Sequence, residues 1–167
     1  MEIRGVVVIL CLMTGLIGCS GNFGLPQSRA EFVKVYKNGG MFRNAEHLTI
    51  NRPKQAVVAD LQQYVDKCLY IKVTTTIRQG YATDRSTATL HPKIVESKGG
   101  VTSLSVQETY RDKPEKGHPP GGLYTLVAEL RARGSQTQLD LYHAGRDAIA
   151  DPLKKWAQGD TGSCPKF

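Results

Sequence analysis

The chain has 167 residues, with 22 basic and 15 acidic side chains and a formal net charge of +7. This length is enough for one folded domain with its own hydrophobic core. The basic residues are scattered, without a run of four or more, so the charge favours an ordinary mixed-charge surface. The alternative is a basic surface that contacts anionic lipid headgroups or acidic polymers.

The N-terminus carries an apolar run that extends from Val6 to Ile17, after a short stretch with one basic side chain, Arg4. The run is too short to span a bilayer, which needs about 20 residues. It is typical of the hydrophobic region of a signal peptide. It ends in Leu16-Ile17-Gly18-Cys19 rather than in the small residues of an ordinary secretory cleavage site. We therefore predict an export signal at the N-terminus, which disfavours a role on DNA.

The ending at Cys19 resembles the lipobox of bacterial lipoproteins. In that family the cysteine thiol receives diacylglycerol, the chain is cut directly before it, and the new amine is usually acylated, for example with palmitate. The resemblance implies that residues 1–18 are a lipoprotein signal peptide that is removed and that Cys19 is lipidated, and several acyl chains would make the attachment stable. Ser20 stands where an aspartate commonly signals retention in the inner membrane. An outer-membrane lipoprotein that faces the periplasm is therefore implied, against the alternative of an apolar helix with an incidental cysteine.

Two cysteines, Cys68 and Cys164, would remain after loss of Cys11 with the signal and lipidation of Cys19. In an oxidising compartment two such cysteines are expected to form a disulfide, with two free thiols as the alternative. The chain has no C-x-x-C motif, and its 4 histidines show no ligand spacing, so we predict neither a metal site nor a cofactor.

The segment of residues 19–27 contains glycine, asparagine and proline, which predicts a flexible tether before a single domain of residues 28–167. Ser28 and Glu31 have the spacing of a capping box and predict the start of a short helix. Asn38-Gly39-Gly40 would end that helix. Residues 46–50 alternate in polarity and predict a short strand.

A helix is predicted from about Pro53 to Lys67, because apolar residues recur there at helical spacing. Its apolar stripe consists of Val57, Leu61, Tyr64 and Cys68. Tyr64 on this stripe is expected to be a core residue with its hydroxyl at the edge of the core.

From residue 70 onward the period changes to two, which predicts antiparallel strands. The predicted strands are residues 70–78, 85–95, 101–110, 123–132 and 137–143. Pro92 interrupts the second strand, which is therefore bulged or lies at a sheet edge. The strand of residues 123–132 is apolar on two faces, so both faces are expected to be partly covered. A final helix opens at Gly145 or Arg146 and reaches Gln158, and Pro152 inside it delays its start or kinks it.

This element order predicts an α+β fold, a curved antiparallel sheet with helices packed on one face. Because Cys68 ends the first main helix and Cys164 follows the last, a disulfide would hold both helices on the same side. The order resembles the helix-grip fold of START-like lipid-transfer domains. It also resembles the helix-grip domains in the C subunit of the outer-membrane β-barrel assembly machine. The resemblance lies in the element order of residues 46–158 alone and implies no ligand or partner residues.

The longest predicted loop, Arg111–Gly122, is the candidate interaction element. Its glycines and prolines give shape without a core, and Arg111, Lys113 and Lys116 supply positive charge beside His118. The alternative is an ordinary exposed loop.

Tyr64 and Trp156 are candidates for lining a cavity between the helices and the sheet, although core packing is the ordinary interpretation of both. His47 and His143 fall in predicted strands and are expected on the sheet surface. The sequence has no G-x-S-x-G motif and no recognisable pair of catalytic carboxylates, so we predict no catalytic residues.

Three functional hypotheses follow from these patterns. The first is a non-enzymatic, lipid-anchored envelope protein that acts as an interaction or assembly module with a protein partner. The second is a helix-grip protein that binds a lipid or another small molecule. The third is an envelope hydrolase.

Overall fold

The computed structural model describes residues 24–38, 44–79, 82–97, 99–111 and 116–167. In chain order the elements are α1 (Arg29–Lys37), β1 (Asn44–Ile50), α2 (Lys54–Tyr64), the π-helical turn η1 (Val65–Leu69), β2 (Lys72–Gln79), β3 (Ala82–Glu96), β4 (Thr102–Tyr110), β5 (Leu123–Arg133), β6 (Gln136–His143) and α3 (Asp147–Gln158). Cys19 and Lys113, two residues of predicted function, lie outside the described residues. None of the helices in the described part is long and apolar enough to cross a membrane.

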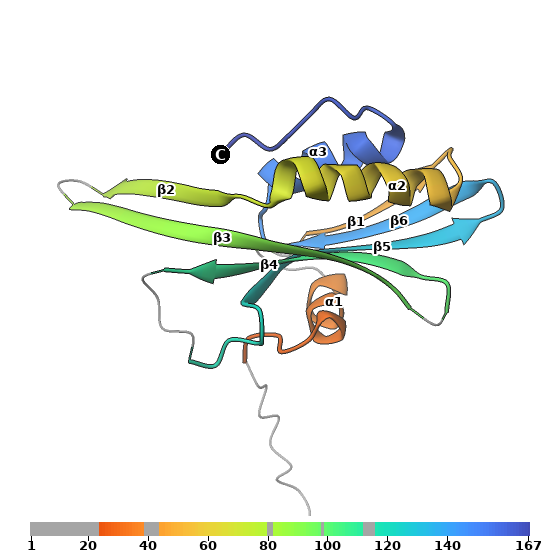
Figure 1. Cartoon of the computed structure of the whole chain (residues 1–167). Coiled ribbons are helices and arrows are strands. Elements are labelled where there is room, and N and C mark those ends of the chain that lie inside the picture. The colour runs from red at the N-terminus through yellow and green to blue at the C-terminus, as the bar shows by residue number, and fades with distance from the viewer. Residues whose placement is uncertain (1–23, 39–43, 80–81, 98, 112–115) are drawn as a thin grey trace, which may run out of the picture.

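The strands form one 6-stranded antiparallel sheet in the order β1-β6-β5-β4-β3-β2. The chain leaves β1 through α2 and re-enters the sheet at the opposite edge in β2. It then adds neighbouring strands in sequence until β6 pairs with β1. The predicted α+β class, a curved antiparallel sheet with helices, is confirmed (Figure 1).

Helices α2 and α3 lie against each other on one face of the sheet, which we call the inner face (Figure 1). Alternate strand residues point to this face and form the main core with the two helices. Its larger buried side chains include Leu61, Leu104, Leu126, Leu130, Leu139, Leu141, Ile149 and Leu153. Each such leucine stabilises the fold by about 2 kcal/mol relative to an exposed position. The predicted placement of both long helices on one side is confirmed.

Helix α1 lies on the opposite face of the sheet, which we call the outer face (Figure 1). The predicted helix start is confirmed, because the hydroxyl of Ser28 accepts from the backbone N–H of Glu31 at 3.2 Å. The Glu31 carboxylate reaches back as expected, but it accepts from the backbone N–H of Gln27 at 2.8 Å, one residue before the position that a capping box requires. Phe32 anchors α1 in a second, smaller cluster with Val127 and Tyr142. The expectation of helices on one face therefore holds for α2 and α3 only. Strand β5 is apolar on both faces because α2 and α3 cover its inner face and α1 covers its outer face.

Strand β5 contains a β-bulge at Thr125, where the pairing with β4 steps from Leu126 directly to Tyr124. One extra residue reverses the face of the positions beyond it. Tyr124 therefore lies on the outer face, with its ring centroid 6.2 Å from that of Phe32. Ordinary alternation already places Val127 on the outer face, and the bulge adds Tyr124 to the same α1 cluster.

Pro92 lies in β3 at a position where this strand has a neighbour on one side only. Strand β2 pairs with β3 only as far as Thr89, and Pro92 pairs with Val106 of β4 on the other side. Proline has no backbone N–H to donate, so this half-open position suits it. The prediction of a sheet-edge position is confirmed locally, although β3 is not an edge strand over its full length.

The predicted disulfide joins Cys68 to Cys164, with 5.3 Å between the Cα atoms. The helix expected to reach Lys67 changes at Val65 into the π-helical turn η1, which buries Cys68 and Leu69. The disulfide therefore fixes the segment after α3 to the end of the first main helix.

Helix α3 begins at Asp147 and continues through Pro152 to Gln158. It ends at Gly159, whose φ of 102° belongs to the left-handed region that favours glycine. The expected opening near Arg146 is confirmed, and the expectation that Pro152 delays the start is wrong, since Pro152 lies inside a helix that already begins at Asp147.

Candidate functional site

Tyr64 and Trp156 pack against each other between the helices and the sheet, with ring centroids 5.7 Å apart. Their exposed fractions are 0% and 1%. The Tyr64 hydroxyl donates to the carbonyl of Ile149 at 3.0 Å, and Trp156 Nε1 donates to the carbonyl of Ser163 at 2.5 Å. Each polar atom thus has a backbone acceptor, and the two rings fill the space that the sequence suggested as a cavity.

A pocket of about 260 Å³ lies farther along the inner face. Strands β2 and β3 extend there beyond the helices, so part of the inner face stays uncovered (Figure 1). Val73, Ala88, Leu90 and Phe167 supply its apolar wall. Phe167 comes from the segment after α3, which the disulfide at Cys164 holds in place. A concave, largely apolar pocket with a few polar groups is the usual form of a small-molecule site.

The polar end of this pocket consists of Glu108, Tyr110 and Arg146. Nη2 of Arg146 donates to Oε2 of Glu108 at 2.5 Å and to the Tyr110 hydroxyl at 3.0 Å. The Tyr110 hydroxyl in turn donates to Oε2 of Glu108 at 2.6 Å. Glu108 is only 1% exposed, so its carboxylate depends on these donors in place of water.

Burial raises the pKa of Tyr110 to about 12, and the hydrogen bond and negative charge of Glu108 act in the same direction. The Arg146 charge opposes them. Tyr110 is therefore a neutral hydroxyl at physiological pH, and the polar end combines one anion, one cation and one hydroxyl.

His143 fixes the backbone of Arg146 at the start of α3. Its Nδ1 accepts from the backbone N–H of Arg146 at 3.1 Å, which leaves Nε2 to donate to Glu46 at 3.3 Å. His143 is 1% exposed on the inner face. The expectation of a sheet-surface histidine is therefore wrong for His143, because the start of α3 covers this end of β6.

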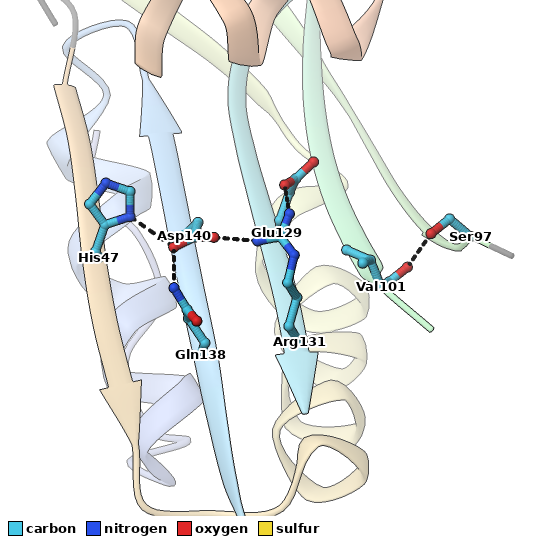
Figure 2. A network of polar contacts seen from close by, with 7 residues as sticks. All are labelled: His47, Ser97, Val101, Glu129, Arg131, Gln138 and Asp140. Atoms are coloured by element: carbon cyan, nitrogen blue, oxygen red, sulfur yellow. Dashed lines mark hydrogen bonds and ion pairs between the residues drawn. The ribbon is translucent and has the colours of Figure 1, made fainter. Parts of the chain in front are cut away.

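The outer face carries a polar network centred on Asp140 (Figure 2). Asp140 accepts hydrogen bonds from His47 at 2.8 Å, from Gln138 at 3.2 Å, and from Arg131. Arg131 also binds Glu129 at 2.5 Å. These side chains belong to the adjacent strands β1, β6 and β5, so the network connects three strands across the exposed surface.

His47 matches the expectation of a sheet-surface histidine, with its side chain 57% exposed. Its contact with Asp140 has the form of the His–Asp half of a hydrolytic triad. Among the described residues, however, no serine, threonine or cysteine is hydrogen-bonded to the other ring nitrogen of His47. The arrangement therefore orients the imidazole without supplying a nucleophile.

The second half of the predicted interaction loop is fixed to the sheet. Gln107 Nε2 donates to the carbonyls of Pro120 at 2.9 Å and Gly122 at 2.8 Å. Gly122 has a φ of 100°, and a Cβ there would lie 2.3 Å from the carbonyl oxygen of Glu108. Pro119 is also buried. The expectation of a wholly exposed loop is therefore wrong for this half.

Two basic residues of this loop, Arg111 and Lys116, are exposed, and His118 is half-buried beside His91 and Pro119. The loop also contacts the start of the domain, since Gln27 Nε2 donates to the carbonyl of Gly117 at 3.0 Å. The described part of the predicted interaction element thus lies beside the segment that precedes α1.

Among the described residues, no group of three or more histidine, cysteine, aspartate or glutamate side chains is placed to hold a metal ion. Comparisons of the chain with protein-family models, with curated proteins and with solved structures find no match.

The sequence predictions did not include Glu108 or Arg146. A signal for Glu108 was present, because the alternation in the predicted strand of residues 101–110 places Glu108 on the same face as the apolar Leu104 and Val106. Arg146 was expected only as a helix start. Its approach to Glu108 depends on the path of the chain between β6 and α3, which no local pattern specifies.

Proposed function

We propose that this protein is a non-enzymatic, lipid-anchored protein of the bacterial envelope that binds a small, partly apolar ligand in the inner-face pocket. The observation that carries the proposal is the combination of an apolar wall with the buried Glu108 and the half-buried Tyr110 and Arg146 at one end. Anchoring by lipid at Cys19 is supported by the lipobox-like sequence that ends there.

The buried carboxylate of Glu108 supports a binding role because a buried charge is a costly way to stabilise a fold. Removing a charge from water costs several kcal/mol, and apolar residues of the same size often stabilise a protein as well or better. Charged groups that line an uncovered pocket are therefore more readily explained by a ligand than by packing.

The test uses the soluble form from Ser20 onward and the uncharged fluorescent probe N-phenyl-1-naphthylamine. Thr75 lines the pocket from the edge strand β2, and Thr76 is the adjacent residue on the opposite face. Thr75→Trp fills the pocket and should abolish saturable probe binding, whereas the matched control Thr76→Trp should retain it. Equal binding by both variants, or no saturable binding by the parent protein, would overturn the proposal. Native mass spectrometry of the purified protein would then reveal any co-purified ligand.

A second candidate function is protein interaction through the basic loop, as part of an envelope assembly. The observation that favours it is the fixed shape of residues 116–122, which Gln107 and Gln27 hold beside the exposed Arg111 and Lys116. Deletion of the loop would be a poor test, because it removes the acceptors of Gln107. Arg111→Glu with Lys116→Glu should instead reduce cross-linking to an envelope partner without changing the melting temperature, and unchanged cross-linking would exclude this surface.

A further inference from the structure

We infer that the ligand of the inner-face pocket is an uncharged amphiphile, whose polar group accepts hydrogen bonds from Arg146 while its apolar part lies against Val73, Ala88 and Leu90. This inference rests on the proposed function and specifies the ligand class for the same pocket. It follows from the charge balance, the available donors and the wall of the pocket.

The polar end of the pocket is already electrically balanced. Arg146 and Glu108 form an ion pair at 2.5 Å, and Tyr110 is neutral. An anionic headgroup near Arg146 would also lie near the carboxylate of Glu108, and a cationic headgroup near Glu108 would lie near the guanidinium. Like charges within about 4–6 Å of each other disfavour ionisation. Either charged headgroup is therefore opposed by one member of the pair, whereas a neutral one is not.

Arg146 can nevertheless offer hydrogen bonds to a ligand. Its side-chain bonds to described residues use Nη2 alone. A guanidinium carries five N–H groups, and those on Nη1 and Nε remain for an acceptor. Arg146 lines the pocket and its side chain is 38% exposed, so the guanidinium is not enclosed by protein. A carbonyl, ester or hydroxyl oxygen has the acceptor character that these groups require.

The rest of the pocket requires an apolar partner of limited size. Val73, Ala88, Leu90 and Phe167 form the wall, and the hydroxyls of Thr75 and Ser86 are the other polar groups that line it. The volume of about 260 Å³ is slightly below the usual range for ligand cavities, which begins at about 300 Å³. A short or medium-length chain fits this space better than a long diacyl lipid.

The experiment displaces N-phenyl-1-naphthylamine from the oxidised soluble protein at pH 7.5 with four probes of equal chain length. These are methyl decanoate, 1-decanol, decanoate and decylammonium, each below its aggregation limit. We expect the two uncharged probes to displace the dye at concentrations at least ten-fold lower than the two ions. Stronger displacement by either ion would overturn the inference while the proposed function stands. Absence of dye binding would instead overturn the proposed function.

The Glu108→Gln variant distinguishes charge recognition from simple packing. It leaves the positive charge of Arg146 unopposed, so decanoate should displace the dye at about ten-fold lower concentration than in the parent protein. Arg146→Gln removes the positive charge, so decylammonium should displace the dye at a lower concentration than in the parent protein. This variant tests the inference if Glu108→Gln does not fold. If the two residues have only a structural role, each variant should weaken the binding of all four probes alike, and that result would also overturn the inference.

Discussion

The guanidinium of Arg146 donates a hydrogen bond to the carboxylate of Glu108 on the inner face of the sheet, where helix α3 begins and strand β4 approaches its end. The two residues are 38 positions apart in the chain. Their contact connects the helical layer to the sheet at the polar end of the pocket. It also determines the net charge of the groups beside which a ligand would bind.

The first prediction concerns the stability of this contact. Glu108→Gln keeps the shape of the side chain but removes the charge-assisted hydrogen bonds, and we expect a loss of about 1–2 kcal/mol in the free energy of unfolding. The partial exposure of Arg146 keeps the loss below that of a fully buried pair. Glu96→Gln is the control, because Glu96 pairs with Lys54 at the surface and its loss should cost about 0.5 kcal/mol or less. Urea denaturation of both variants measures the difference, and equal losses would contradict the prediction.

The second prediction concerns His143. His143→Leu removes the acceptor of the Arg146 N–H and the donor to Glu46, and it should lower the free energy of unfolding by about 1–2 kcal/mol. Hydrogen exchange should increase at the first turn of α3. His91→Leu, at an exposed histidine bonded to Thr109, is the control and should leave α3 unchanged. Unchanged hydrogen exchange in His143→Leu would show that the hydrogen bond from Arg146 to His143 does not stabilise the start of α3.

The third prediction concerns the disulfide, which closes a loop of 96 residues. Cys68→Ser with Cys164→Ser should lower the free energy of unfolding by about 4–5 kcal/mol according to chain entropy. Residues 160–167 should lose protection from hydrogen exchange before α2 and α3 do. A reducing agent should destabilise the parent protein and leave the double variant unchanged. A similar effect on both would point to a cause other than the disulfide.

The fourth prediction concerns alkaline pH. The pKa of Tyr110 is raised to about 12 in the folded protein by burial, whereas an unperturbed tyrosine has a pKa of 10.0. The folded state therefore keeps a proton that the unfolded state releases, so stability falls as the pH rises between these two values and is complete below pH 10. Urea midpoints measured from pH 9 to about 11.5 should decline. The decline should be shallower in Tyr110→Phe, and an identical slope in that variant would assign it to other groups.

The fifth prediction concerns the docking of α1. Phe32 is 1% exposed, and its ring stacks on that of Tyr36 with centroids 4.0 Å apart. Phe32→Ala should cost up to about 3 kcal/mol and detach α1 while the inner-face core stays folded. Hydrogen exchange should therefore increase in α1 and stay low in β4. Lys34→Ala, at an exposed position of the same helix, is the control. Native-like protection of α1 in Phe32→Ala would contradict this account.

Local patterns were sufficient to predict most of the fold. The stripe of α2 and the alternation of the strands gave the helices and the antiparallel sheet, because each pattern reflects which face is buried. The disulfide followed from the two cysteines that would remain after the predicted export to an oxidising compartment. The apolar character of both faces of β5 indicated that both would be covered, but nothing in the sequence assigned α1 to the outer face. The β-bulge at Thr125 that turns Tyr124 outward also leaves no pattern in the sequence.

The candidate site was less predictable, because its residues come together through long-range contacts. Tyr64 and Trp156 were suggested as cavity residues on the basis of their helical stripes, but those stripes describe the filled core. The pocket arises where the strands extend beyond the helices, and it depends on element lengths that no short motif records. Glu108 was identifiable as an inward-facing charge, whereas its partner Arg146 was not.

The contact between Gln27 and Gly117 places the entry of the chain into the domain on the outer face, beside α1. The pocket opens on the inner face, so the chain enters the domain on one side of the sheet and the pocket lies on the other. If the protein is anchored at Cys19 and binds a ligand as proposed, this separation keeps the tether away from the mouth of the pocket. Ligand exchange with the aqueous space would then require no detachment of the protein from its anchor.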